Sequence, residues 1–348
     1  MEYRLLGNTG LKVSPLCLGA MMFGGPTDAA TAERIIKKAF DAGINQIDTA
    51  DQYHGGQSER IVGAAIKPQR DNWIVSTKLA NPMGPGVNQN GLSRKWIIQA
   101  VEDSLRRLDT DYIDILYFHR EEYDTPLSSS LQAVRDLIRA GKVRYLGLSN
   151  FRAWRIAEVA NLCDRYGMDR PAASQPYYNA MNRMPEVEVL PACAHYGIGV
   201  IPYSPLARGV LTGKYRPDAA PPPDTRAGRG DKRMLEAEWR KESLEIAQVL
   251  REHAEKKGIT AGQFAVNWVL NNALVSATLV GPRTEAHLDD YLAALNYRFD
   301  EEDEALVDKL VTTGHPSTPG YNDPHYLIEG RQPRSIAPLH RDTPKPTH

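Results

Sequence analysis

The feature that most constrains the fold is a regular alternation between short apolar runs and amphipathic segments. Eight strand-like runs recur between residues 16 and 280, at 16–20, 46–48, 73–77, 112–118, 143–148, 172–176, 199–203 and 277–280. Several are almost continuously apolar, as expected for parallel strands that are buried on both faces. Eight such strands separated by helices predict a single α/β domain, a (β/α)8 TIM barrel.

Helix-like segments fill the intervals between these runs. They lie at 31–42, 58–66, 93–107, 127–140, 152–166, 186–196, 242–257, 261–271, 285–294 and 301–312. An open doubly wound sheet is the alternative architecture. It would normally carry a Gly-x-Gly-x-x-Gly turn after an early strand if it bound a dinucleotide. The sequence contains no such run.

Three segments stand outside the alternation: an N-terminal hairpin, a long loop and a C-terminal tail. Residues 3–6 and 11–13 flank a cluster of turn formers, which predicts an N-terminal β-hairpin that caps the bottom of the barrel. A long loop follows the seventh strand, from 206 to 239, and its centre at 219–231 is too rich in proline, glycine and charge to pack as a core element. We interpret this loop as a flap.

The predicted single domain spans residues 1–348, with the barrel at about 14–312 and an extended tail at about 313–348. The tail carries many prolines and few aliphatic runs, so we expect it to wrap over the surface or to reach a neighbouring subunit. A monomer and a homo-oligomer both remain open.

Composition excludes several classes of function. The net charge of −1 gives no general attraction to nucleic acid or to membranes. No apolar run reaches the ~18 residues of a membrane span, and no signal peptide is apparent, so we expect a cytoplasmic protein. Three cysteines without Cys-x-x-Cys spacing suggest a reducing compartment. The histidines and cysteines show no metal-binding pattern, so no metal is expected.

Four polar residues near the ends of strand-like runs point to carbonyl chemistry: Asp48, Tyr53, Lys78 and His119. A phenol with a pKa near ~10 is a poor acid at neutral pH, so a proton-donating tyrosine needs a nearby cation. We expect Lys78 to lower the pKa of Tyr53, and Asp48 to keep Lys78 charged. In this hypothesis Tyr53 is the general acid and His119 orients the carbonyl, while a nicotinamide supplies hydride. Four unrelated roles, such as a turn cap or a solvated lysine, are the alternative.

The chain resembles the aldo-keto reductase superfamily, whose members are NAD(P)H-dependent carbonyl reductases on an α/β barrel. The resemblance implies that Asp48, Tyr53, Lys78 and His119 form the catalytic tetrad. The motifs that carry it are Asp48-Thr-Ala-Asp-Gln-Tyr53, Ser76-Thr-Lys78, the strand-end His119, Gly147-Leu-Ser-Asn-Phe151, Tyr203-Ser-Pro-Leu-Ala-Arg-Gly-Val-Leu-Thr-Gly-Lys214 and Gly281-Pro-Arg-Thr284.

The same resemblance implies a set of cofactor contacts. On the nicotinamide side these are Ser149, Asn150, Gln175 and the stacking ring of Tyr203, together with Asp48 and the backbone of Gly19 and Met21. Along the pyrophosphate they are Ser204, Leu206, Arg208, Gly209 and the clamp residue Lys214. On the adenosine side they are Gly281, Arg283, Thr284 and His287. Arg283 precedes a predicted helix, so its guanidinium and the helix N-terminus favour the 2′-phosphate of NADPH over NADH.

Substrate specificity is less readable, because it depends on loops at the barrel mouth. Candidate pocket walls are Met22, Phe23, Asn81, Arg120 and Trp154. Arg120 is either an attractor for an acidic substrate or, with better odds, half of a surface salt bridge. The leading prediction is NADPH-dependent reduction of an aldehyde or ketone. Oxidation of a sugar or polyol is an alternative, and so is a cofactor-binding regulatory subunit similar to the potassium-channel β subunits.

Overall fold

Eight parallel strands form a curled sheet in the order β10-β3-β4-β5-β6-β7-β8-β9. The structure is a computed structural model, and it describes residues 1–326 and residue 328. Backbone hydrogen bonds join the two outermost strands, from Ser276 N to the Val200 carbonyl and from Leu279 N to the Pro202 carbonyl, both at 2.9 Å. The predicted (β/α)8 barrel is therefore confirmed. The strands are β3 (Leu16–Gly19), β4 (Gln46–Asp48), β5 (Ile74–Leu79), β6 (Ile113–Phe118), β7 (Val143–Ser149), β8 (Ala173–Gln175), β9 (Gly199–Val200) and β10 (Thr278–Val280).

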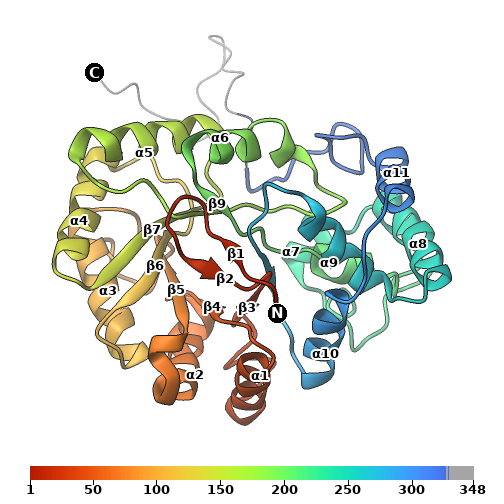
Figure 1. Cartoon of the computed structure of the whole chain (residues 1–348), viewed down its shortest axis with the longest axis horizontal. Helices are drawn as coiled ribbons and strands as arrows, with labels where there is room; N and C mark the ends of the chain where they lie inside the picture. Colours follow the sequence, from red (N-terminus) through yellow and green to blue (C-terminus); the bar gives the residue numbers. More distant parts are fainter. Residues whose placement is uncertain (327, 329–348) are drawn as a thin grey trace.

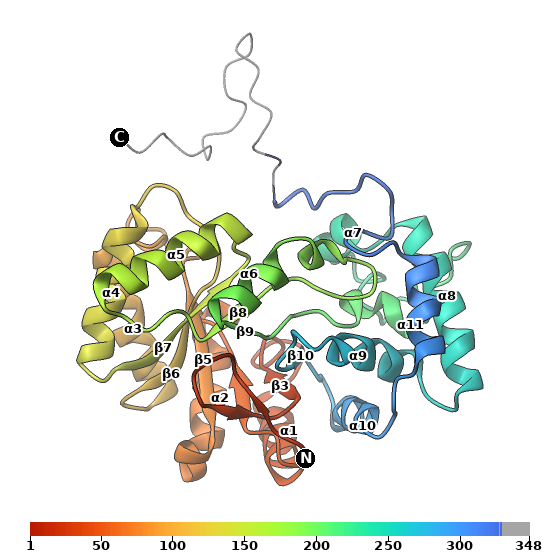
Figure 2. The same cartoon turned by 45° about the horizontal axis from the view of Figure 1, so that its top comes forward.

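Helices surround the strands on the outside of the barrel (Figures 1 and 2). Polar residues cap several of their N-termini: Asp28 accepts from Thr31 N, and Thr260 forms a capping box with Gln263. The helices are α1 (Ala29–Asp41), α2 (Gln57–Ile66), α3 (Arg94–Leu108), α4 (Leu127–Arg139), α5 (Ala153–Tyr166), α6 (Val189–Tyr196), α7 (Lys232–Ala237), α8 (Lys241–Lys256), α9 (Ala261–Asn271), α10 (Glu285–Ala294) and α11 (Glu301–Leu310).

The predicted N-terminal hairpin is present as β1 (Arg4–Leu5) paired antiparallel with β2 (Lys12–Val13). It lies across one end of the barrel (Figure 2). Gly7 at its turn has a φ of +51°, and a Cβ there would lie 2.5 Å from the Gly197 carbonyl oxygen just before β9. Only glycine permits so close an approach. The hairpin thus closes the N-terminal end of the strands and leaves the opposite end for chemistry.

The core has two parts. A large cluster packs the outer face of the sheet against the helices, and a smaller one fills the barrel. The inner cluster includes Leu6 and Val13 of the hairpin together with Ile115, Tyr117 and Ile201. The barrel is therefore a packed core closed at one end, with its polar groups displaced to the other.

Two predicted segments differ in detail from the structure. The helix expected at 186–196 is divided, with the 3-10 turn η3 (Met184–Glu186) before α6. The long loop after β9 is also less irregular than expected, because it contains the 3-10 turn η4 (Ala207–Thr212) and the helix α7. Met234 of α7 is fully buried, and Ala227, inside the stretch predicted not to pack, is buried as well. Isolated apolar side chains in a proline-rich loop are enough to dock it on the barrel.

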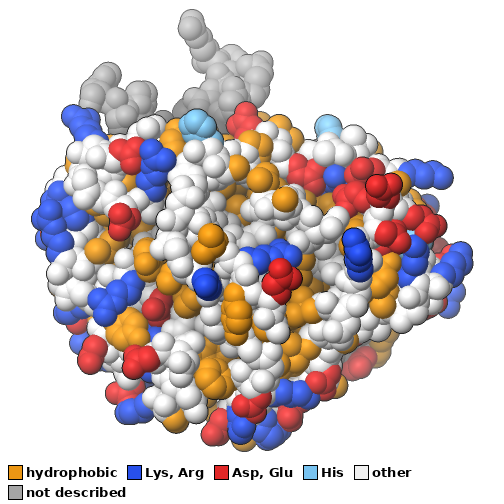
Figure 3. All heavy atoms as spheres, in the orientation of Figure 1, with side chains coloured by type: hydrophobic (Ala, Val, Ile, Leu, Met, Phe, Trp, Pro, Cys, Tyr) orange, Lys and Arg blue, Asp and Glu red, His pale blue; other side chains and the backbone are white. Residues whose placement is uncertain are grey.

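Residues 313–326 cross the barrel surface. Ser317 N donates to the Met181 carbonyl at 2.9 Å, and Arg233 of α7 binds the carboxylate of Asp323. The remainder of the predicted tail, residue 327 and residues 329–348, lies outside the described residues. Elsewhere on the surface, acidic side chains gather over α11, whose first turn carries four of them (Figure 3). Within the described residues, no helix combines the length and apolarity needed to span a bilayer.

Candidate active site

Unusual backbone geometry gathers where strands end. Among the described residues, seven other than glycine have positive φ: His54, Ala80, Asp109, Asn150, Ser204, Ala207 and Arg208. Asp109 caps α3, and the other six lie on loops that follow β4, β5, β7 and β9. Such conformations are energetically costly and persist where the surrounding structure imposes them, often at functional sites. The barrel's C-terminal end is therefore the candidate active site.

A buried ion pair lies at the centre of this end. Lys78 Nζ donates to Asp48 Oδ1, and both side chains are almost fully excluded from solvent, at 0% and 1% exposed. Lys78 also donates to the Thr49 carbonyl at 2.8 Å. The second carboxylate oxygen of Asp48 accepts from Ser76 at 2.8 Å and from Gln175 at 3.1 Å. Each charge therefore has a partner and several hydrogen bonds, the condition under which a buried ion pair is tolerated.

Tyr53 lies beside this pair, as the sequence predicted. Lys78 Nζ is 5.2 Å from the centre of the Tyr53 ring. The predicted direction of the pKa shift is wrong, however. Burial raises the pKa of the Tyr53 phenol, and the opposing effect of the Lys78 ammonium does not overcome it. The sequence argument included the charge and omitted the desolvation of the phenolate.

His119 completes the predicted tetrad. Its ring meets the Tyr53 ring edge to face, with centroids 5.9 Å apart. Burial lowers the pKa of His119 well below its usual value, and the neighbouring cations Lys78 and Arg120 add to the shift. The imidazole is therefore neutral at physiological pH. Its Nδ1 is buried without a hydrogen-bond partner among the described residues.

The residues predicted to hold the nicotinamide form one connected group. Ser149 Oγ donates to the Gln175 carbonyl at 3.0 Å, and Asn150 Nδ2 donates to the His119 carbonyl at the same distance. The Tyr203 hydroxyl donates to Asn150 Oδ1 at 2.9 Å. Tyr203 therefore lies next to the tetrad, with its ring 5.6 Å from the ring of Tyr177.

The predicted pyrophosphate loop follows β9 directly. Ser204, Ala207 and Arg208 all adopt positive φ, and Gly209 has a φ of +102°. A Cβ at Gly209 would lie 3.2 Å from Lys214 Nζ, so the loop and the predicted clamp lysine are neighbours. Leu206 belongs to the same turn, and its carbonyl accepts from Gly209 N at 2.8 Å. A loop with several residues at positive φ can direct backbone N–H groups toward a bound anion.

Cations converge on Lys214. Partial desolvation lowers the pKa of its ammonium, repulsion from Arg283, Arg229 and Arg226 lowers it further, and attraction to Asp224 offsets part of the shift. Desolvation lowers the pKa of His287, and Arg283 and Lys214 lower it further. Arg226 pairs with Asp231, so part of this positive charge is balanced. The remaining excess marks a site suited to a polyanion.

The other predicted cofactor residues lie around the same rim. Thr284 caps α10 through His287 N, which places Arg283 just ahead of a helix N-terminus as expected. A Cβ on Gly281 would meet no atom within 4 Å, so open space adjoins its backbone. Met21 is exposed, and its carbonyl is 3.0 Å from His54 Nε2. Gly19 is buried at the end of β3, where it is paired in register with Asp48, and its predicted backbone contact stays a prediction.

The residues proposed to line the substrate pocket differ in how exposed they are. Phe23 is wrong, because its side chain is 0% exposed and belongs to the hydrophobic core. Its apolar character, which suggested a pocket wall, directs it inward. Met22 and Asn81 are partly exposed, and Trp154 is 51% exposed. Arg120 is exposed and takes part in none of the ion pairs between described residues, so the predicted surface salt bridge is not seen.

Two buried carboxyl groups near the rim were missed. Asp51 is fully buried, and neither oxygen has a hydrogen-bond partner in the described part of the chain. Burial and the nearby Glu59 raise the pKa of Asp51 to about 7. Asp51 stands inside the quoted tetrad motif, so the motif itself was the available signal. Glu238, at the end of α7, is the other, and nothing in its local sequence marks it as buried.

Comparisons with known proteins agree with this geometry. The sequence model of the Aldo/keto reductase family matches residues 15–312. A probable voltage-gated potassium channel subunit beta of Arabidopsis thaliana is 36% identical over 301 residues, covering 85% of this chain and 92% of the relative. The versiconal hemiacetal acetate reductase of Aspergillus parasiticus is 33% identical, with 90% and 99% covered. The L-glyceraldehyde 3-phosphate reductase of Escherichia coli is also 33% identical, with 90% and 93% covered. The resemblance seen in the sequence is thus confirmed, and the chain belongs to the aldo/keto reductase family.

Proposed function

We propose that this oxidoreductase reduces an aldehyde or ketone to an alcohol with NADPH, and that Tyr53 donates the proton. The observation that carries the proposal is the buried Asp48–Lys78 ion pair beside the Tyr53 ring at the C-terminal end of the barrel. When bound, the nicotinamide would supply hydride to the carbonyl carbon. The protein must then supply a proton and a positive charge at the carbonyl oxygen.

Each member of the tetrad has a role that its surroundings support. The Lys78 ammonium stabilises negative charge as it develops on the phenol oxygen of Tyr53. Asp48 fixes that ammonium in place through a buried contact. Neutral His119 can orient the substrate carbonyl by hydrogen bonding without adding a further charge.

Tyr53 is protonated at neutral pH, because its pKa lies above the ordinary value of a phenol. That is the form that can donate a proton to the oxygen of the reacting carbonyl. The Lys78 ammonium, 5.2 Å from the centre of the Tyr53 ring, would stabilise the phenolate that this donation leaves behind. The same groups can act in reverse, so oxidation of a sugar or polyol stays the alternative direction.

NADPH is the proposed cofactor because of the charge around Lys214. Three arginines lie close enough to Lys214 to lower its pKa, and such a group of cations suits a cofactor that carries several phosphates. Arg283 next to the N-terminus of α10 suits the additional 2′-phosphate. We expect NADPH to have at least a tenfold higher kcat/KM than NADH.

The proposal is tested with purified protein, NADPH and a panel of aldehydes, sugars and keto acids. Tyr53→Phe should lower kcat by about 100-fold or more, because it removes only the proton donor. The Kd for NADPH should stay unchanged. Turnover by Tyr53→Phe at the wild-type rate would refute the assignment of the general acid.

A second candidate is a cofactor-binding regulatory subunit. It is favoured by the relatives named as potassium channel β subunits in Arabidopsis thaliana and Oryza sativa. The same experiment separates the two candidates. Tight NADPH binding without turnover of any carbonyl in the panel would favour the regulatory role.

A further inference from the structure

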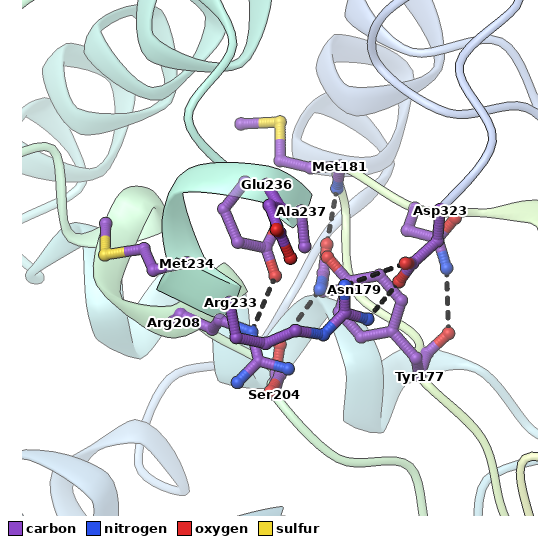
Figure 4. A network of polar contacts seen from close by, with 12 residues as sticks. Tyr177, Asn179, Met181, Ser204, Arg208, Arg233, Met234, Glu236, Ala237 and Asp323 are labelled. Carbon is purple, nitrogen blue, oxygen red and sulfur yellow. Dashed lines mark hydrogen bonds and ion pairs between the residues drawn. The ribbon is translucent and has the colours of Figure 1, made fainter. Parts of the chain in front are cut away.

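A second buried ion pair lies near the rim, outside the tetrad. Glu238, which follows α7, is 0% exposed. Its carboxylate oxygen Oε1 is 3.6 Å from Nε of Arg208, whose side chain is 11% exposed. Figure 4 shows Arg208 next to α7, close to Met234, Glu236 and Ala237. The pair therefore joins the end of α7 to the predicted pyrophosphate loop, within the flap after β9.

This pair is poorly satisfied. Both oxygens of Glu238, Nε of Arg208 and the hydroxyl of Tyr177 are buried and form no hydrogen bond of good geometry within the described residues, although the hydroxyl lies close enough to the carboxylate to lower its pKa. At 3.6 Å the two charges attract each other without forming a hydrogen bond. Buried polar groups are usually paired, so three unsatisfied ones in one place call for a functional explanation.

The backbone around Arg208 is also unusual. Arg208 has a φ of +52°, and the preceding Ala207 has a φ of +45°. The Ser204 carbonyl of this loop is held at 3.0 Å by Asn179 Nδ2, which in turn is fixed through Met181 N (Figure 4). The loop is thus anchored at its start, while Glu238, 3.6 Å away, is the one ion-pair partner of the Arg208 guanidinium in the part of the chain that the structure describes.

The charge of the Glu238 carboxyl group is opposed by burial and supported by its neighbours. Burial raises the pKa of its carboxyl group. The Tyr177 hydroxyl on the loop after β8, Arg208 on η4, and Arg240 and Arg233 at the two ends of α7 offset only part of this rise. A carboxyl group whose pKa is raised by burial takes up a proton more readily when its cationic partner moves away. No unpaired negative charge then stays buried.

We propose that Glu238 is an internal counter-anion that competes with the cofactor diphosphate for Arg208. In the free protein its carboxylate neutralises the guanidinium, and diphosphate binding draws the guanidinium away. This inference rests on the proposed use of NADPH. It assigns Glu238 the role of weakening cofactor binding, which favours exchange of NADP+ for NADPH between turnovers.

The alternative is that Glu238 positions Tyr177, and through it the ring of Tyr203. The two roles predict opposite results. If Glu238 competes for Arg208, its neutralisation strengthens cofactor binding. If Glu238 supports the aromatic platform, its neutralisation weakens binding, and Tyr177→Phe has a similar effect.

The test measures the Kd for NADP+ by fluorescence or calorimetry in full-length variants. Glu238→Gln keeps the shape of the side chain and removes its charge, so we expect binding about tenfold tighter, mainly through slower release. Glu236→Gln is the matched control, because it removes the same charge from the same helix at a more exposed position. It should change Kd less than twofold.

A double-mutant cycle locates the effect. In an Arg208→Gln background, Glu238→Gln should leave the Kd for NADP+ unchanged, because the competition no longer exists. Glu238→Asp, which shortens the side chain, should tighten binding less than Glu238→Gln and serves if the latter does not fold. Melting temperatures establish that each variant is folded.

The outcomes are distinguishable. Unchanged or weaker binding by a folded Glu238→Gln, with the wild-type protein binding NADP+ normally, would overturn this inference and leave the proposed function intact. Equal tightening in Glu236→Gln would reduce the effect to net charge. If the wild-type protein binds neither NADP+ nor NADPH, both the inference and the proposed function fail.

Discussion

Two buried ion pairs lie at the same end of this barrel, and they are built differently. Lys78 and Asp48 contact each other directly and share hydrogen bonds with Thr49, Ser76 and Gln175. Arg208 and Glu238 lie 3.6 Å apart, and the atoms that face each other lack hydrogen bonds to described residues. Hydrogen bonds fix both partners of the Lys78–Asp48 pair, whereas electrostatic attraction alone holds the Arg208–Glu238 pair.

The difference matches the functions that we propose for the two pairs. A proton donor needs its ammonium at one position, because a small displacement costs much of the electrostatic stabilisation. A phosphate-binding arginine must exchange one anion for another in each catalytic cycle. A carboxylate with a complete set of hydrogen bonds would hold the arginine too tightly for this exchange. The reacting end of the site is therefore preorganised, and the cofactor end is left adaptable.

The fixed pair should be the more costly to break. Lys78→Met leaves Asp48 buried without its cation, so the free energy of unfolding should fall by about 3–5 kcal/mol. Carbonyl reduction should fall by about 1000-fold or more, because Tyr53 loses its neighbouring charge. Denaturant unfolding and single-turnover kinetics with NADPH measure the two effects.

An exposed ion pair provides the control. Lys67 pairs with Asp109 and is 64% exposed, so Lys67→Met should change stability by less than about 1 kcal/mol. A similar loss of stability in both variants would show that the buried position of Lys78 has no special importance. The contrast between fixed and loose pairs would then lose its physical basis.

Asp51 allows the fixed end to be tested by pH. Its pKa of about 7 in the folded protein lies above the ordinary value of 3.8. Between these two pH values the folded state holds a proton that the unfolded state has released. Stability due to this group therefore falls as pH rises from about 4 to about 7, and stays low above that. Asn at this position removes the dependence.

We expect Asp51→Asn to gain stability relative to the wild-type protein as pH increases. The difference in free energy of unfolding should grow by about 2 kcal/mol between pH 5 and pH 8. Urea unfolding at both pH values provides the measurement. Asp41→Asn, at a position whose side chain is 58% exposed, should show no such growth. A constant difference between Asp51→Asn and wild type would mean that Asp51 is ionised throughout.

The two ends of the site also differ in how far sequence could reveal them. The proximity of Asp48, Lys78 and His119 was predictable because they stand at or just after strand ends, and strand ends meet on one face of a parallel barrel. The barrel followed from the alternation of strands and helices, and the N-terminal hairpin followed from its cluster of turn formers. The pKa shift of Tyr53 did not, because it depends on burial, which the spacing of residues does not determine.

The Arg208–Glu238 pair was beyond the reach of that argument. The two residues lie 30 positions apart, on either side of a proline-rich stretch with no periodic pattern. Glu238 is buried only because α7 docks through Met234 and Ala237. A loop's packing depends on a few such side chains, and sequence reasoning has no repeating signal for them. Phe23 failed for a related reason, since an apolar residue on a rim loop can face either way.

Salt concentration should affect the cofactor end and the reacting end of the site differently. This is the smallest of the three effects that we predict. The cations near Lys214 are only partly buried, so raising KCl from about 0.05 M to 0.5 M should screen them and weaken NADPH binding by about tenfold. The buried Lys78–Asp48 pair is shielded from mobile ions, so kcat at saturating NADPH should change less than twofold. Arg283→Ala should reduce the slope of log Kd against log salt, because one fewer cation faces the anion. If kcat instead falls in parallel with cofactor affinity, salt reaches both ends of the site, and the reacting end is not the closed, preorganised region that its geometry indicates.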